Sequence, residues 1–346
     1  MSKTLQDYAT LINDTIQSNE INHYITTDNM CQNLGGIDTF KNINIPQGKV
    51  RSFQKDDVLL SNIRLYFRKV YRAKQKGGCS SDVLVFRAKH IDSATLFAIL
   101  SSQIFTDYAC SGSQGSKMPR GNKTHMMDFK IPTINFTIAK IFNSIQNKIE
   151  NNHKVNELLH TLAYKIYEYY FKYKPKNAKL EQIIIENPKS SIMVKNAQKT
   201  QDKYPFFTSG DNILFYPKAI IDGRNCFLNT RGNAGIKFYV GKASYSTYTW
   251  CICANEFSDY LYLLLSNIKT HINQSFFQGT IIKQLQKNLL KKYPIYMPSA
   301  HEIKKFNQII MPLLTLISIN TRTSKKLEQI RDFLLPLLLK QQVKPQ

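Results

Sequence analysis

Residues 141–171 read IFNSIQNKIENNHKVNELLHTLAYKIYEYYF and indicate one long amphipathic helix. Apolar residues recur at intervals of three and four, the spacing of one helix face, and no Gly or Pro interrupts them. Counted from Ile134 the pattern covers 38 residues, or about 57 Å at about 1.5 Å per residue. An ordinary globular helix is about a third as long, so the length of this helix requires an explanation. The residues expected on its apolar face are Ile141, Ile145, Ile149, Leu159, Leu162 and Ile166.

Bulk composition favours a folded protein of more than one domain. The 346 residues allow two or three domains, and 42% hydrophobic with 12% aromatic residues argues against disorder. No apolar run reaches the roughly 18 residues of a membrane span. The first residues, MSKTLQDYATLIND, lack the basic-then-apolar pattern of a secretory signal. We therefore expect a soluble, cytoplasmic protein.

Motifs for catalysis and metal binding are missing from the sequence. The six cysteines lack zinc-ligand spacing and are expected to be buried free thiols, so no metal site is predicted. GSQGSK at 112–117 has the wrong spacing for a phosphate-binding P-loop. No Pro-Pro dipeptide is present for an adenine methyltransferase motif, and IENPKS at 185–190 has the wrong spacing for a nuclease. We therefore expect no catalytic residues in this chain.

The net charge points to a polyanionic partner. Lys and Arg total 47 against 24 acidic residues, a net charge of +23. Such an excess attracts polyanions, and nucleic acid is the usual one because each neutralised phosphate releases counterions. The alternative is a biased genome composition that inflates Lys without function. The distribution of the charge has to distinguish the two.

The basic residues gather in particular segments. RLYFRKVYRAKQK at 64–76 contains no acid, and residues 231–242 repeat the pattern with interleaved Asn and Tyr. Basic groups position a phosphate backbone, whereas Arg, Asn, Gln and Ser on loops read base edges. A solvated surface charge remains the alternative for any single residue. The residues expected at the nucleic acid are Arg64, Arg68, Lys69, Arg72, Lys74, Lys76, Gln114, Lys117, Arg120, Lys123, Ser209, Arg224, Asn225, Arg231, Asn233, Lys237, Lys242 and Gln278.

The chain also repeats itself. KVYRAK at 69–74 returns as KFYVGK at 237–242, and SGSQG at 111–115 returns as SFFQG at 275–279. A second helical pattern, from about 302 to 339, aligns with the first. Offsets that drift by only a few residues indicate a duplicated plan. We predict four segments: a domain at 1–133, a long helix at 134–174, a domain at 175–298 and a long helix at 299–346.

Each domain is predicted to be mixed α/β, because short strand-like segments lie between turn residues and precede helical patterns. The strand-like segments are 58–64, 82–88, 226–232 and 249–254, and the helical patterns that follow are 93–105 and 256–268. Two helices with one apolar face each bury those faces most readily against one another. We therefore expect an antiparallel two-helix coiled coil between the domains, with approximate twofold symmetry. Pro312 and Pro336 should kink or end the second helix. Its expected apolar face comprises Phe306, Ile309, Leu313, Leu327, Ile330 and Leu334.

Several of these segments match a known pattern. NKIENNHKVNELLHTLAYKIYEYYF at 147–171 is similar to a conserved central helix, and KYPFFTSGDN at 203–212 to the opening of a target-recognition domain. YITTDNM at 24–30, GG at 35–36, KMPRGNK at 117–123 and KIP at 130–132 resemble the rest of that pattern. Along nearly its whole length the chain resembles the specificity (S) subunit of type I restriction-modification enzymes.

The resemblance implies two target-recognition domains, each reading one half of a split site in double-stranded DNA. The paired helices would separate these domains and dock the modification (M) subunits, two in number. In this family S-adenosylmethionine-dependent adenine methylation belongs to the M subunits, and ATP- and Mg-dependent cleavage belongs to the restriction (R) subunit. The chain itself would carry no cofactor. The long helix would act as a ruler, because half-sites on one face of B-DNA recur every 34–36 Å or so.

Two other readings of the sequence remain open. The first is a stand-alone or orphan DNA-binding protein without methyltransferase partners, which would not co-purify with M subunits. The second is a self-sufficient nuclease with an unfamiliar site, which would cut plasmid DNA in the presence of magnesium.

Overall fold

The computed structural model describes residues 3–38, 43–131, 134–197, 203–210 and 213–338. Position 132 of KIP, positions 211–212 of KYPFFTSGDN and the expected helix end at 339 lie outside these residues. Two compact units make up the chain. Unit 1 comprises Met1–Glu150 with Leu327–Gln346, and unit 2 comprises Asn151–Lys326. Each long helix therefore contributes to both units, which differs from the four consecutive segments expected.

A four-stranded antiparallel sheet forms the centre of unit 1. Its order is β1 (Ala9–Ile12), β8 (Val83–Ala88), β5 (Val58–Ser61) and β6 (Val70–Arg72). Successive side chains of a strand point to opposite faces. Leu84 and Phe86 of β8 accordingly join one hydrophobic cluster, whereas Val83 and Val85 join another. Because both faces are covered, β8 is apolar throughout its first four residues instead of alternating with polar ones.

A second sheet and four short helices complete the globular part of unit 1. The sheet has the order β2 (Thr15–Gln17), β4 (Lys49–Phe53), β7 (Gly77–Cys79) and β3 (Tyr24–Ile25), with β3 parallel to β7. The helices are α1 (Leu5–Tyr8), α2 (Ser93–Leu100), α3 (Gln103–Ser111) and α4 (Lys123–Met127). The sequence pattern predicted one helix over 93–105. It breaks there because the Ser102 hydroxyl caps a new helix by accepting from the Phe105 amide at 3.2 Å.

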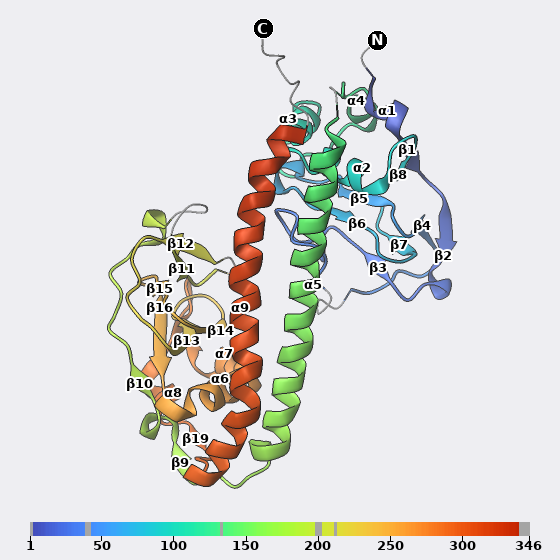
Figure 1. Cartoon of the computed structure of the whole chain (residues 1–346). Helices are drawn as coiled ribbons and strands as arrows, with labels where there is room; N and C mark the ends of the chain where they lie inside the picture. The colour runs from blue at the N-terminus through green and yellow to red at the C-terminus, as the bar shows by residue number, and fades with distance from the viewer. Residues whose placement is uncertain (1–2, 39–42, 132–133, 198–202, 211–212, 339–346) are drawn as a thin grey trace. The chain divides into compact units, whose positions relative to one another are not determined.

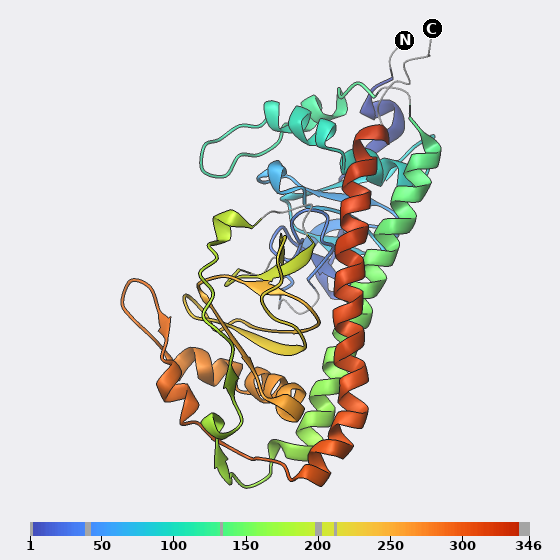
Figure 2. The ribbon, with the colours of Figure 1, turned by 60° about the vertical axis from the view of Figure 1, so that its left-hand side comes forward.

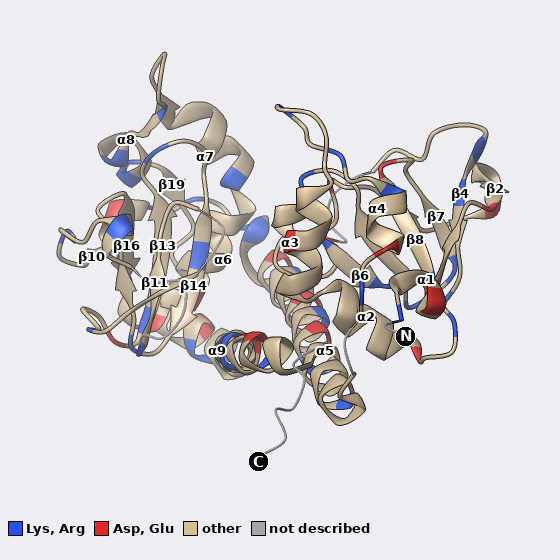
Figure 3. Ribbon diagram, turned by 90° about the horizontal axis from the view of Figure 1, so that it is seen from above, with Lys and Arg blue, Asp and Glu red and all other residues tan. Residues whose placement is uncertain are grey.

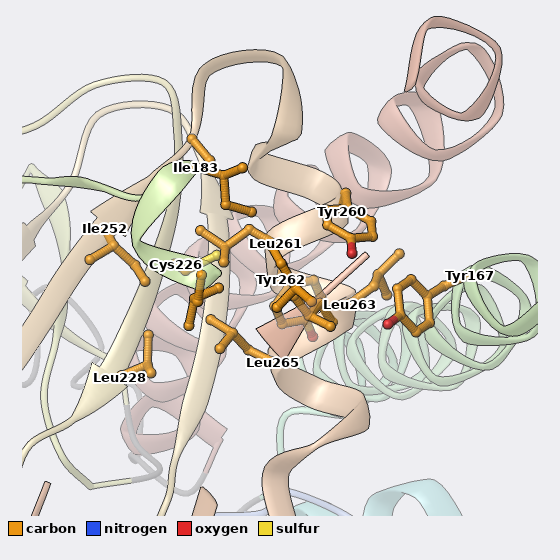
Figure 4. Close-up of a cluster of buried hydrophobic side chains, with 14 of the residues drawn as sticks. Tyr167, Ile183, Cys226, Leu228, Ile252, Tyr260, Leu261, Tyr262, Leu263 and Leu265 are labelled. Atoms are coloured by element: carbon orange, nitrogen blue, oxygen red, sulfur yellow. The ribbon is translucent and has the colours of Figure 1, made fainter. Parts of the chain in front are cut away.

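Unit 2 has the corresponding central sheet. Its order is β10 (Ile185–Glu186), β16 (Thr249–Cys253), β13 (Arg224–Asn229) and β14 (Ile236–Val240), all antiparallel. Cys226, Leu228 and Ile252 face the main core, where they meet α6 (Ser258–Asn267), as Figure 4 shows. Phe227 and Cys251 point to the opposite face, against a smaller cluster.

Shorter elements surround the central sheet of unit 2. A three-stranded sheet has the order β12 (Leu214–Tyr216), β11 (Tyr204–Phe207) and β15 (Ser244–Tyr245), with β11 parallel to β15. Two-stranded pairs join β17 (Phe277–Gln278) to β18 (Gln284–Leu285), and β9 (Ala178–Lys179) to β19 (Pro294–Ile295). The remaining short helices are α7 (Lys269–Ser275) and α8 (Lys287–Lys291). The mixed α/β class expected from the sequence is confirmed.

Two long helices are also present, as expected (Figures 1 and 2). Helix α5 spans Phe136–Tyr167, 32 residues, and continues as a π-helical turn over Glu168–Lys172. Helix α9 spans Ala300–Leu338, 39 residues. Of the two effects expected of Pro312 and Pro336, a kink or an end, the second is wrong, because α9 continues through both prolines. Both prolines are exposed, so the carbonyl left without its helical N–H donor at each point can be hydrated.

Polar side chains join the two helices within each unit. In unit 2 the Asn152 amide donates to the Ser324 hydroxyl at 3.1 Å, and the Asn320 amide donates to Asn156 at 3.0 Å. In unit 1 the buried Arg331 guanidinium donates to the side-chain amide oxygen of Gln146 at 3.0 Å. Residues later in α5 pair with residues earlier in α9. The helices therefore run antiparallel in each unit.

The apolar face expected on these helices is only partly the buried face. Ile149 and Phe306 are buried, whereas Ile141, Leu162, Ile309 and Ile330 are between 42% and 49% exposed. The helices instead bury Ala139, Phe142, Gln146 and Asn152. The expectation failed because it assigned only apolar residues to the interface, and polar residues with matched hydrogen-bond partners are buried equally well. The other expected positions, which are half-buried, are Ile145, Leu159, Ile166, Leu313, Leu327 and Leu334.

Candidate nucleic-acid interface

The basic cluster at 64–76 begins with a tight turn in unit 1. Arg64 and Arg68 flank the turn Leu65–Phe67, and both adopt a left-handed backbone with φ of 50°. The Arg68 guanidinium donates to the Ser101 carbonyl at 2.9 Å, and burial lowers its pKa. Arg64 donates to the Lys117 carbonyl at 3.2 Å, and Lys69 donates to the Thr27 carbonyl. These three cations therefore hold neighbouring loops in place.

The second half of the cluster reaches α5. The Lys74 ammonium lies 2.9 Å from a Glu150 carboxylate oxygen and 3.0 Å from the Asn147 side chain. Arg72 lies 3.8 Å from Asp56, while Lys76 is exposed. Residues 64–76, which include no acidic residue, thus pair with acidic residues from other parts of the chain. Sequence reasoning had no signal for the Glu150 partner, because Glu150 is 76 positions from Lys74 and lies on a different element.

A projecting loop of unit 1 carries the next group of expected residues. Gln114 and Arg120 exchange backbone hydrogen bonds of 2.9 Å, which closes residues 114–120 into a hairpin. Lys117 and Lys123 are exposed, and Arg120 is 62% exposed although it pairs with Asp82 at 2.9 Å. This loop and the start of α4 therefore present three cations to solvent.

Several expected residues of unit 2 are structural. Arg224 forms a bidentate ion pair with the buried Asp259, donates to the Thr315 hydroxyl at 3.0 Å, and its side chain is only 17% exposed. Burial raises the pKa of Asp259, although the hydrogen bonds from Arg224 oppose that rise. Asn225 is buried and accepts from the Asn187 amide at 2.8 Å.

Two further residues of unit 2 tie its loops together. The Ser209 hydroxyl donates to the Tyr248 carbonyl at 2.7 Å. The Lys237 ammonium donates to the Thr208 carbonyl at 2.7 Å and also to Gly210. These contacts fix the turn after β11 against the central sheet.

The other expected residues of unit 2 reach solvent. Arg231 is exposed and stacks on the Tyr248 ring, 4.1 Å from its centroid. Asn233 and Gln278 are exposed. Lys242 is exposed at an open depression of about 480 Å³, which Lys203 and Lys218 also line. Sequence reasoning missed Lys203 and Lys218, because no spacing rule connects them to Lys242.

The fold thus separates the expected residues into two groups. The first makes contacts that hold loops or helices in place, and of its members Lys74 is exposed as well: Arg64, Arg68, Lys69, Arg72, Lys74, Ser209, Arg224, Asn225 and Lys237. The second reaches solvent on loops and edges: Lys76, Gln114, Lys117, Arg120, Lys123, Arg231, Asn233, Lys242 and Gln278. The second group offers ammonium and guanidinium groups for phosphates and amides for base edges.

Within the ranges given above, no group of three or more His, Cys, Asp or Glu side chains is placed to hold a metal ion. No helix in the described part of the chain is long and apolar enough to cross a membrane. The six cysteines, all within the described ranges, are free thiols, with Cys79, Cys226 and Cys251 buried.

Both units are mixed α/β, and both expose basic loops. Residues 176–329 match the family described as "Type I restriction modification DNA specificity domain". This match covers less than half of the chain, and it agrees with the resemblance seen in the sequence. No curated protein matches the chain.

Solved structures give the comparison of fold. The type I restriction-modification S subunit of M. genitalium is 13% identical with a TM-score of 0.64, over 99% of this chain and 96% of that one. The HsdS subunit of Thermoanaerobacter tengcongensis is 13% identical over 98% and 96% of the two chains, with a TM-score of 0.37. A chain from work on assembly and conformational transition of the type I R-M system is 12% identical over 98% and 97%, also at 0.37. The likeness of fold therefore rests on the M. genitalium protein.

Proposed function

We propose that this chain is the subunit of a type I restriction-modification complex that reads a split target in double-stranded DNA, one half by each unit. The observation that carries the proposal is the specificity-domain match over residues 176–329. The matching strand orders of the two central sheets support a second reader in unit 1. Each unit also exposes its own set of cations, such as Lys117 in unit 1 and Arg231 in unit 2.

The long helices are the proposed docking surface for modification subunits. Large apolar side chains that are exposed in one row mark interaction sites more often than scattered ones do. On α5 these are Ile141, Val155, Leu158 and Leu162, and on α9 they are Ile309, Leu316, Ile319, Ile330 and Phe333, all between 41% and 73% exposed. Two modification subunits would bind here, and the restriction subunit would join through the complex.

Catalysis and cofactors belong to the partners in this proposal. S-adenosylmethionine would bind the modification subunits, and ATP and Mg would act at the restriction subunit. This chain would supply the sequence preference and a framework for assembly.

Mapping methylated adenines tests the proposal. Genomic DNA is sequenced for this modification in cells with the chain, without it, and with it restored. The expected result is a split motif that disappears on deletion and returns on restoration. Co-purification with the tagged chain should recover modification subunits, and exchange of Leu158 and Leu162 for Ser should reduce that recovery. A chain that binds DNA but leaves the methylation pattern unchanged would instead favour a stand-alone DNA-binding protein.

A further inference from the structure

Each unit carries a hairpin of the same construction. The hairpin of unit 1 covers residues 114–120 and the hairpin of unit 2 covers residues 278–284; we call them the tip hairpins. Each begins with a Gln-Gly pair, and each glycine, Gly115 at φ +97° and Gly279 at φ +136°, adopts a conformation that other residues rarely take. Each is closed by pairing across its base, Gln114 with Arg120 and Gln278 with Gln284.

Both tip hairpins extend away from the sheets of their own unit, and Figure 2 shows the unit 2 hairpin as the orange loop between β17 and β18. The flanking Phe277 and Leu285 are 5% and 8% exposed and belong to the main core of unit 2. At the tip Ile281 is 96% exposed and Ile282 is 53% exposed, and Met118 of unit 1 is also 53% exposed. The unit 2 hairpin therefore anchors apolar side chains at its base and presents others to solvent.

The surroundings of these apolar tips are basic. Residues 111–127 contain Lys117, Arg120 and Lys123 without an acid, and residues 275–292 contain four lysines without an acid. Two of these cations have acidic partners on other elements, Arg120 with Asp82 and Lys291 with Glu186. Lys283 lies on the unit 2 hairpin itself, and basic residues also colour α8, which follows the hairpin (Figure 3). The remaining excess of cations favours DNA over a protein partner with an apolar groove.

We propose that the two tip hairpins enter grooves of the DNA, where Met118 and Ile281 make apolar contact with bases while Lys117 and Lys283 contact phosphates. Apolar side chains read the thymine methyl group in the major groove and wedge between base steps in the minor groove. Gln114 and Gln278 stand at the bases of the hairpins and can bond base edges. This inference rests on the proposed function, and it assigns one hairpin to each half of the target.

The test uses the assembled complex of this chain with its modification subunits and a duplex that contains the methylated motif of the wild type. In unit 2 Ile281 and Ile282 are both changed to Ser, and in unit 1 Met118 is changed to Ser. We expect each variant to weaken binding to the motif duplex by about tenfold, with affinity for a scrambled duplex little changed. Lys283→Ala should weaken binding to both duplexes and lower the slope of log affinity against log salt by about one.

Tyr173→Ser is the matched control, because Tyr173 is 86% exposed in the same unit but lies after α5. It should bind as the wild type does, and all variants should keep the wild-type melting temperature. Wild-type affinity of the Ile281/Ile282 double variant for the motif duplex would overturn the inference and leave the proposed function standing. A wild-type complex that prefers no duplex would overturn both.

Discussion

Replacement of Arg224 by Ala should destabilise unit 2 strongly. The carboxylate of Asp259 is 2% exposed, and Arg224 is its bidentate partner. The loss of one member of such a pair leaves a buried charge uncompensated, which costs about 3–5 kcal/mol. For a unit of this size each kcal/mol lowers the melting temperature by about 2–4 °C, so we expect a fall of about 6–20 °C.

The pH dependence of this loss follows from Asp259. Burial raises the pKa of Asp259, and the hydrogen bonds from Arg224 oppose that rise. In the folded Arg224→Ala variant this opposition is absent, so the Asp259 carboxyl takes up a proton more readily. A folded-state pKa above the unfolded value means that stability falls as pH rises through that interval. The difference in the free energy of unfolding between the variant and the wild type should therefore become smaller as the pH is lowered from 7 towards 5. Calorimetry and urea unfolding at several pH values measure it.

The double variant Arg224→Ala, Asp259→Leu provides the control. It removes the stranded charge and should recover most of the lost stability, because apolar replacements of buried ion pairs are often neutral. Lys242→Ala, at an exposed site, should change stability by less than about 0.5 kcal/mol. If Arg224→Ala proves as mild as Lys242→Ala, then Arg224 is not a structural cation and is available to contact DNA.

Three further predictions concern a turn, a carboxylate and the helix pair. Gly279→Ala should cost more than about 1 kcal/mol in urea unfolding, because a Cβ would lie 2.6 Å from the Ile282 carbonyl oxygen at φ +136°; Gly210→Ala, with 3.5 Å to its nearest neighbour, should be almost neutral. Burial acts to raise the pKa of Glu186, but hydrogen bonds from Lys291 and Trp250 lower it overall. The ionised carboxylate of Glu186 therefore stabilises the folded protein above about pH 4.5, and this contribution is lost as pH falls through the lowered pKa. The fluorescence of Trp250, the one tryptophan in the sequence, should report that titration, and an unchanged titration in Glu186→Gln would contradict the assignment. One heptad inserted after Glu150 in α5 and another after Lys326 in α9 keep the polar pairs of both units intact and lengthen the two helices by about 10 Å. Sequencing of methylated adenines should then show the same two half-sites with a DNA spacer about three base pairs longer. A spacer of unchanged length would refute the idea that the helices set the distance between the half-sites.

Local patterns were sufficient to predict the class of fold. Alternation and turn residues predicted strands near β5, β8, β13 and β16, and the three-and-four spacing predicted α5 and α9. Their partners were not predictable in the same way. Gln146 and Asn152 are polar and were not among the residues expected on the apolar face, yet both are buried and bond to Arg331 and Ser324. A hydrogen bond between residues 185 positions apart leaves no periodic signal.

The candidate site illustrates the same limit. Charge clustering found the basic segments but not which of their members meet an acid, so Arg72 and Arg224 looked equivalent to Lys117. The matching Gln-Gly pairs were visible in the sequence. The exposed tips of Met118 and Ile281 were not, because an apolar residue in a short segment normally predicts burial.

The nested order of the two units has a consequence for biosynthesis. Unit 2 is one continuous stretch, and its core is complete once Ile317 has left the ribosome. The core of unit 1 includes Leu335 and Leu338, which are made almost two hundred residues after Phe142, their partner in that cluster. Domains generally fold in the order of their synthesis. Here the core of unit 1, most of which is translated first, is completed last. Nascent chains in which residue 326 is followed by a linker that carries it out of the ribosome should therefore resist protease in unit 2 and remain cleavable in unit 1.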